Sequence, residues 1–289
     1  MRLFTLAIAM CLFWAINIVN AQNNTPKKTA AAPAKNSEAK QKLLFDKFFE
    51  LNDGDSADVV LKSKIGTDIY QLDNKSKYGI YVSAWANTYA EQYDAAIRLI
   101  EQLKKDYADW AEVYFLHAQY LDYKEQNGFI EQAQKCIEMN PKLIYPLFFL
   151  ATKYEELENY KLALRYYDML EKAAPTHKSV FYNRGYIKSI LKDSKGAISD
   201  YTKALQLNPK HHRALFNRGR EYMFLKEYAN AETDFDTFIK VKSDYDEAYY
   251  YRGAAKYYQK KQDAACVDMK KAAQLGHKGA ADFVTTYCQ

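Results

Sequence analysis

The sequence predicts an all-α fold in which helical hairpins of constant length stack side by side. The main observation is a spacing of 34 residues that three residue types keep. The three series are Ala163, Ala197, Ala231 and Ala265; Pro141, Pro175 and Pro209; and Gly185, Gly219 and Gly253. Such self-similarity is typical of a repeat fold in which each hairpin buries its apolar face against its neighbours.

The composition supports this fold. The chain has 289 residues, of which 48% are hydrophobic, with only 10 Gly and 6 Pro, so it is not a disordered chain. Tyrosine is abundant, with 26 residues. Because tyrosine combines an apolar ring with a hydroxyl, it suits thin layers whose side chains contact both the core and water.

The positive charge is concentrated near the N-terminus. The net charge is +5, but Arg2 and the segment up to Lys40 supply most of it, which leaves +1 for the rest. Nucleic-acid binding requires a basic surface that neutralises phosphates. The nearly neutral body therefore predicts no nucleic-acid partner.

Residues 1–21 are predicted to be a signal peptide. Arg2 precedes an apolar run from Leu3 to Val19, and Ala21 provides a cleavage point before Gln22. An uncleaved membrane anchor is the alternative. Lipidation at Cys11 is a further possibility, but residues 7–10 are a poor lipidation motif. We expect an exported protein, periplasmic or secreted, whose membrane contact comes only through the signal peptide or an envelope complex.

Two segments precede the repeats. Residues 22–40 are polar and rich in Pro, Ala and Lys, which predicts a flexible linker. Residues 41–76 are predicted to form an N-terminal cap or a degenerate repeat, because Leu44, Phe48 and Leu51 share one helical face. Residues 52–55 hint at a calcium loop, but the later ligand spacing and the bidentate Glu are missing, so a turn is favoured.

The repeats are aligned on the alanine series. This gives repeats at 144–177, 178–211, 212–245 and 246–279, each with two apolar-periodic stretches of helical length separated by a polar turn. Each alanine opens the second helix, where two helices approach closely, and Pro175 and Pro209 end that helix. Residues 280–289 are predicted to form a C-terminal cap, with a closing helix from Ala280 to Tyr287.

The order of large residue, Gly or Ala, Tyr, Ala, aromatic residue, Ala and Pro resembles the tetratricopeptide repeat. The resemblance covers residues 110–279, with irregularities at 126–132, at Lys188 where Tyr is usual and at Ser243 where Pro is usual. Residues 110–143 are a further repeat and about 77–109 a degenerate one, so the repeat region is expected to span 77–279. The resemblance implies a right-handed solenoid of helical hairpins whose first helices line a concave peptide-binding groove.

Three arginines are predicted to be structural. Arg184, Arg218 and Arg252 are each followed 16 residues later by an aspartate, and the repeat with Leu150 in place of Arg has Tyr166 in place of Asp. A buried charge is tolerated only when it is matched. We therefore expect ion pairs between the two helices of a repeat, Arg184 with Asp200, Arg218 with Asp234, and Arg252 with Asp268.

Cys266 and Cys288 lie on the last two predicted helices. An exported chain meets oxidising conditions, so a disulfide between them is one expectation. Two separate buried thiols are the other, and the sequence does not decide between them. Cys136 occupies a small buried repeat position, where a thiol acts as a small hydrophobe.

The groove positions implied by the family contain many rings. Arg213, Asn217 and Arg220 share one face of one first helix, where they could bind a carboxylate or an extended backbone. Burial of some rings between repeats, and simple solvation of the charged face, are the alternatives. The predicted groove residues are Tyr182, Asn183, Tyr186, Arg213, Asn217, Arg220 and Tyr250.

Catalytic sequence motifs are absent. The sequence contains no nucleophile elbow, no zinc-protease motif and no phosphate-binding glycine run, and its five histidines are scattered. We therefore expect no catalytic residue, no metal site and no cofactor. The leading hypothesis is an exported scaffold that binds a protein or peptide segment, in envelope complex assembly. The alternative is a carbohydrate or cell-wall binding module, whereas an enzyme would need a catalytic domain within 41–109, which is too short.

Overall fold

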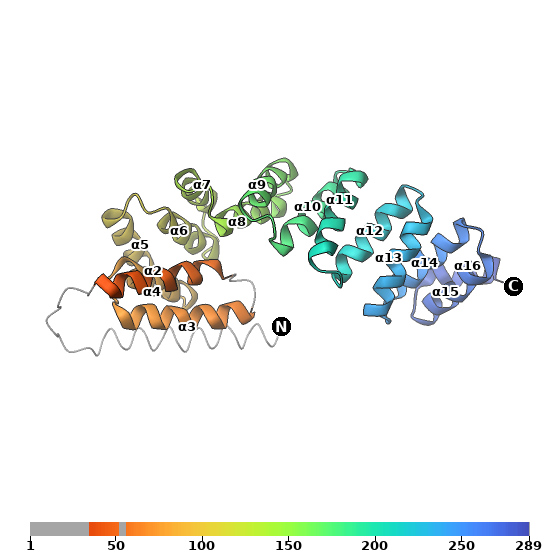
Figure 1. The fold of residues 1–289 in the computed structure, drawn as a ribbon, viewed down its shortest axis with the longest axis horizontal. Coiled ribbons are helices and arrows are strands. Elements are labelled where there is room, and N and C mark those ends of the chain that lie inside the picture. Colours follow the sequence, from red (N-terminus) through yellow and green to blue (C-terminus); the bar gives the residue numbers. More distant parts are fainter. Residues whose placement is uncertain (1–34, 52–55, 289) are drawn as a thin grey trace. The chain divides into compact units, whose positions relative to one another are not determined.

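The computed structural model describes residues 35–51 and 56–288, and the regular structure within them is α-helical (Figure 1). These residues divide into two compact units, one ending at Lys153 and the other beginning at Tyr154. The predicted signal peptide, residues 22–34 of the linker and the turn at 52–55 lie outside the described residues. None of the described helices is both long enough and apolar enough to span a membrane.

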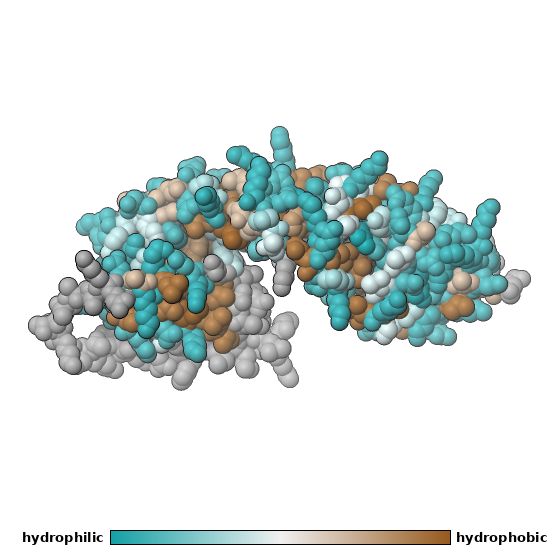
Figure 2. All heavy atoms as spheres, viewed as in Figure 1, coloured by the Kyte–Doolittle hydropathy of each residue, from teal (hydrophilic) through white to brown (hydrophobic). Residues whose placement is uncertain are grey.

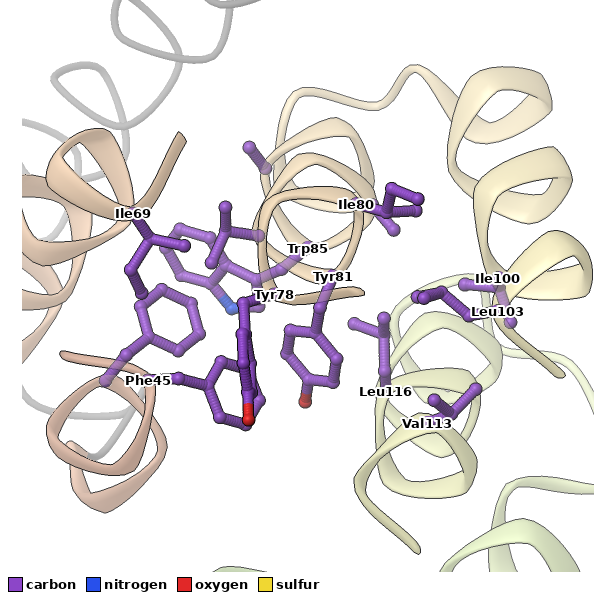
Figure 3. Packing of buried hydrophobic residues seen from close by; sticks show 14 of the residues in the cluster. Phe45, Ile69, Tyr78, Ile80, Tyr81, Trp85, Ile100, Leu103, Val113 and Leu116 are labelled. Carbon is purple, nitrogen blue, oxygen red and sulfur yellow. The ribbon is translucent and has the colours of Figure 1, made fainter. Parts of the chain in front are cut away.

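Within its described residues, the first unit contains six complete helices. They are α2 (Lys35–Glu50), α3 (Ser56–Leu72), α4 (Lys77–Tyr89), α5 (Tyr93–Asp106), α6 (Ala111–Tyr123) and α7 (Phe129–Met139), and the unit boundary falls within α8 (Ile144–Glu156). The core gathers rings from several of these helices (Figure 3). Phe45 of α2 meets Tyr81 of α4 edge to face, with 4.8 Å between ring centroids.

Helix α2 begins within the stretch predicted to be a linker. Residues 35–40 are helical, so the linker prediction is wrong at its C-terminal end. The physical reason is that this helix is anchored in the core. Gln41 donates hydrogen bonds to the backbone carbonyls of Ile69 and Asp73, at 3.0 and 2.9 Å, and Phe45 and Phe48 are buried. These contacts hold the helix in place, and it continues from them towards the N-terminus as far as Lys35.

The second unit consists of consecutive helical hairpins. Its helices are α9 (Tyr160–Ala173), α10 (Lys178–Ile190), α11 (Ser194–Leu207), α12 (His212–Phe224), α13 (Tyr228–Val241), α14 (Asp246–Tyr258), α15 (Gln262–Gln274) and α16 (Lys278–Tyr287). Helices α10 and α11, α12 and α13, and α14 and α15 pack as pairs (Figure 1, green to blue). The fold is therefore the antiparallel hairpin fold that the sequence predicts.

The glycine series marks the closest approach within each pair. At Gly219 of α12, an added Cβ would lie 2.9 Å from the ring of Phe235 on α13. The corresponding aromatic ring at Gly185 is Tyr201, at 3.0 Å. Only a residue without a side chain lets these buried rings pack against the helix backbone.

Each arginine of the series contacts two hairpins. Arg218 donates from Nε and Nη2 to the carboxylate of Asp234, at 2.7 and 2.6 Å, in a bidentate pair within its own hairpin. Its Nη1 donates to Thr202 of the preceding hairpin at 2.9 Å. Arg184 pairs with Asp200 and Arg252 with Asp268 in the same way, and each also reaches the preceding hairpin, at Asp168 and Asp236 respectively. The second contact was not predicted.

The C-terminal helix is attached covalently. Cys266 of α15 and Cys288, just after α16, form a disulfide with a sequence separation of 22 residues. The helix begins at Lys278, two residues before the predicted start, because His277 caps it by accepting a hydrogen bond from the amide of Ala280 at 3.1 Å. Cys136 is a buried free thiol whose pKa burial raises.

Candidate functional site

A hollow lies at the N-terminal ends of α10, α12 and α14, which are the first helices of the hairpins in the second unit. Its volume is about 360 Å³, and it opens between α10 and α12 and extends to α13 and the start of α14. Hydrophobic residues gather over α10 to α12, with hydrophilic ones around them (Figure 2). The residues lining the hollow are Tyr182, His212, Arg213, Phe216, Asn217, Arg220, Phe238, Lys242, Tyr245 and Glu247.

Four of the predicted groove residues meet here. The side-chain amide of Asn217 donates to the hydroxyl of Tyr182 at 3.4 Å, which joins two neighbouring hairpins. Arg213 and Arg220 lie on the same helix as Asn217, and both side chains are exposed. Burial raises the pKa of Tyr182, so this phenol stays protonated and can donate as well as accept. The hollow thus combines rings with donors that can bind a carbonyl or a carboxylate.

The other three predicted residues lie elsewhere. Asn183 forms a hydrogen bond with the buried Tyr167, which places its amide in the packing between hairpins. Tyr250 stacks on His277, with ring centroids 4.1 Å apart, so the C-terminal cap covers it. Tyr186 is exposed at 43% but does not line the hollow. Asn183 and Tyr250 therefore take part in packing, with the preceding hairpin and with the C-terminal cap respectively.

A second hollow lies towards the C-terminal ends of the same helices. Its volume is about 530 Å³, and Arg220 lines both hollows. Phe224 is exposed at 70% and Tyr258 at 58%, and Tyr258 stacks on Tyr228 with 4.9 Å between centroids. Lys192 and Lys226 contribute cations from the turns between helices. Arg220, Phe224 and Tyr251 are groove positions that the family resemblance implies, whereas the two lysines were not predicted.

Lys192 and Lys226 occupy equivalent positions in successive repeats, and Lys260 occupies the same position in the next one. Lys192, Lys226 and Lys260 follow the C-terminal ends of α10, α12 and α14 and have φ angles of 62, 62 and 64°. This left-handed conformation ends the first helix and normally favours glycine. At the same position in the earlier hairpins, Glu91, Glu125 and Glu158 have φ angles of 58, 52 and 55°. The 34-residue step of these lysines in the sequence is the signal that could have revealed them.

The first unit has a separate aromatic cavity. It has a volume of about 240 Å³, and Asp122, Gln119 and Lys62 provide polar groups at its wall. Asp122 forms a salt bridge with Lys153 at 2.9 Å. Tyr123 is exposed at 40%, and its ring lies 5.4 Å from that of Tyr89. The other lining residues are Phe49, Leu51, Tyr81, Phe115, Tyr145, Phe148, Phe149 and Thr152.

Clusters that could bind a metal ion are absent from residues 35–51 and 56–288, since no three His, Cys, Asp or Glu side chains converge there. Two histidines, His211 and His277, cap helices. His211 Nδ1 accepts a hydrogen bond from the amide of Ala214 at 3.2 Å and caps α12. Burial lowers the pKa of His211, so this acceptor is present at neutral pH.

Comparisons with known proteins agree with the geometry. The family model for the tetratricopeptide repeat matches residues 179–211 and 212–245. No curated protein matches the chain. The matched family is a structural repeat and is not a catalytic domain.

Solved structures share the fold at low sequence identity. The C-terminal part of a repeat protein from Cytophaga hutchinsonii is 18% identical, with a TM-score of 0.61 over 84% of this chain and 98% of that one. YrrB, described as a protein with an unusual peptide-binding site, is 19% identical, with a TM-score of 0.58 over 64% and 97%. The protein MamA is 19% identical, with a TM-score of 0.54 over 62% and 96%. Residues 179–245 therefore match the tetratricopeptide repeat over two repeats, and the helical hairpins around them share the fold of these solved structures.

Proposed function

We propose that the chain is an exported, non-enzymatic scaffold that binds a protein or peptide segment along α10, α12 and α14, in the assembly of an envelope complex. The observation that carries the proposal is the hollow shared by neighbouring hairpins, where Tyr182, Arg213, Asn217 and Arg220 combine rings with exposed donors. Aromatic and arginine side chains supply most of the binding energy in protein interfaces. The peptide-binding site named for YrrB supports the same use of this fold.

Export is supported by the disulfide. The bond between Cys266 and Cys288 persists in oxidising compartments and is rare in the cytosol. If the protein is exported, mass spectrometry of the native protein should show a mature N-terminus at Gln22. A cytosolic protein that retains Met1, with both cysteines reduced, would contradict the proposal.

A pull-down from the envelope fraction of the source organism tests segment binding. The bait is the full chain, compared with Arg213→Ala and Tyr186→Ala. We expect the wild type to recover a partner that both variants lose or recover weakly, because both side chains are exposed on the face of the first helices. Lys270→Ala is a matched control, since Lys270 is exposed on α15, the second helix of its hairpin, and so lies off the first helices. Recovery of identical partners by all four proteins would exclude the groove as the binding site.

A carbohydrate or cell-wall ligand is the second candidate, and the aromatic cavity of the first unit favours it. Sugar rings stack on aromatic faces, and Gln119 and Asp122 place an amide and a carboxylate beside the rings. On this alternative, Tyr123→Ala should weaken binding of cell-wall fragments in a sedimentation assay, whereas Tyr186→Ala should not. Equal binding by both variants and the wild type would remove the alternative.

A further inference from the structure

The cations of the two hollows differ from the structural arginines in their pairing. Arg184, Arg218 and Arg252 each form salt bridges with carboxylates. By contrast, among the described residues none of the cations that line the hollows forms a salt bridge. These cations are Lys192, Arg213, Arg220, Lys226 and Lys242.

The acids near the hollows accept hydrogen bonds from neutral donors, which do not neutralise a carboxylate, and none of these acids forms a salt bridge with a cation that lines the hollows. Of the carboxylates that line the hollows, Glu221 accepts a hydrogen bond from Ser189 and Glu247 accepts one from Tyr245. Two acids that follow the turn lysines in sequence are also bonded: Asp193 caps α11 at Gly196, and Glu227 accepts from Asn230. Five cations line the two hollows against two carboxylates, Glu221 and Glu247, so the hollows carry excess positive charge.

The backbone does not require this charge. Glu158 occupies the same left-handed turn position as Lys192 and Lys226, so the turn forms with either sign. A lysine there suits the negative end of the helix dipole, but this effect is small at an exposed site. The change from glutamate to lysine coincides with the hairpins that form the second hollow, where Phe224 and Tyr258 are exposed beside the lysines.

From this charge pattern, and resting on the proposed function, we infer that the segment bound by the second unit is acidic and carries apolar side chains between its carboxylates. The rings of Phe224, Tyr258 and Tyr182 receive the apolar side chains. The carboxylates pair with Arg220 between the two hollows and with Lys192 and Lys226 at the turns. Complementary charge of this kind determines which partner binds and how fast it associates.

Binding of designed peptides to the full chain tests the inference. Three fluorescent peptides share one length and one pattern of Phe residues, and carry Glu, Gln or Lys at the remaining positions. We expect the Glu peptide to bind, the Gln peptide to bind about tenfold more weakly and the Lys peptide not to bind, since several exposed pairs of modest energy are lost together. Raising the salt concentration should weaken only the Glu peptide.

A charge-reversal variant gives the matched test. Lys192→Glu combined with Lys226→Glu places at both turns the residue that Glu158 already supplies, so the fold should be kept, which circular dichroism checks. This variant should lose the preference for the Glu peptide, whereas Lys270→Glu should retain it.

Each other outcome overturns the inference. If the Gln peptide binds as tightly as the Glu peptide, the bound segment need not be acidic, although the chain still binds a segment. Tighter binding of a single-stranded oligonucleotide or of phosphatidylserine vesicles would assign the charge to a different class of ligand. If no peptide binds, the inference of an acidic segment is also rejected. If the pull-down also shows no difference between wild type and groove variants, the proposed function fails with it.

Discussion

One guanidinium links two hairpins at each position of the arginine series. The bidentate pair between Arg218 and Asp234 leaves the third nitrogen free to reach Thr202 of the preceding hairpin. A lysine could not make these contacts together, because its ammonium group lacks the planar fork. The recurring arginine thus joins the two helices of a hairpin and also joins consecutive hairpins.

Removing this arginine should destabilise the protein far more than removing its exposed neighbour. Arg218→Leu leaves the buried carboxylate of Asp234 without its partner, and we expect a loss of about 3 kcal/mol in the free energy of unfolding. Arg220→Leu on the same helix should change it by less than about 0.5 kcal/mol, since Arg220 forms no salt bridge with a described residue. Urea unfolding measures both variants. Equal losses would contradict a structural role for the pair.

Acidification should weaken α12 through its N-terminal cap. Burial holds the pKa of His211 below its usual value of 6.5, so the folded state favours the neutral ring that accepts from Ala214. A group whose pKa is lowered on folding contributes stability above its unfolded pKa, and this contribution is lost as the pH falls through the folded pKa. Stability should therefore decrease as the pH drops below 6.5.

Replacing the histidine tests this assignment. His211→Asn keeps an N-cap acceptor that does not titrate in this range, so thermal unfolding should depend less on pH than in the wild type. Part of the dependence should remain, because burial also lowers the pKa of His117 and His177. An unchanged pH profile would show that His211 contributes nothing to it.

At the scale of the helices, close approach within each pair outweighs helix propensity. Gly219 lies in the interior of α12, where alanine would be preferred by about 1 kcal/mol in an isolated helix. The ring of Phe235 is fully buried and leaves no space for a methyl group. The glycine is therefore explained by packing.

The alanine variant should reverse the usual effect of the substitution. We expect Gly219→Ala to destabilise the protein by about 1 to 3 kcal/mol through overpacking. Gly279→Ala in α16 is the control, because the nearest atom to its added Cβ lies at 3.4 Å, and it should be neutral or stabilising. Thermal unfolding of the two variants decides the point. A gain in stability at Gly219 would mean that Phe235 can move aside.

The helices of the repeats were predictable because their signals are local in sequence. The alanine and glycine series indicate where two helices meet. In one repeat Leu150 replaces the arginine and Tyr166 replaces the aspartate, and this joint replacement indicates that the two residues pair in the other repeats. Only the start of helix α2, residues 35–40, was missed, because these polar residues are held in the helix by contacts made further along, by Gln41 and Phe45. Local patterns do not reveal that kind of support.

At the scale of the whole molecule, the candidate site was only partly predictable. Family positions identified the residues on the first helices, but which of them stay uncovered depends on neighbours. The cap residue His277 covers Tyr250, and Tyr167 binds Asn183. The second hollow depends on the turn lysines and on Phe224, whose exposure becomes visible only once the hairpins are packed. The sequence pattern thus predicts the candidate face, whereas packing determines which of its residues remain exposed.

Site-specific photo-crosslinking in living cells tests the central claim, that the face formed by α10, α12 and α14 holds a protein segment. A photoreactive amino acid replaces Tyr186, which is exposed on α10, and in a separate strain it replaces Lys270, which is exposed on α15. We predict a discrete crosslinked partner from position 186 and none from position 270. The same product from both positions, or no product from position 186, would contradict the account.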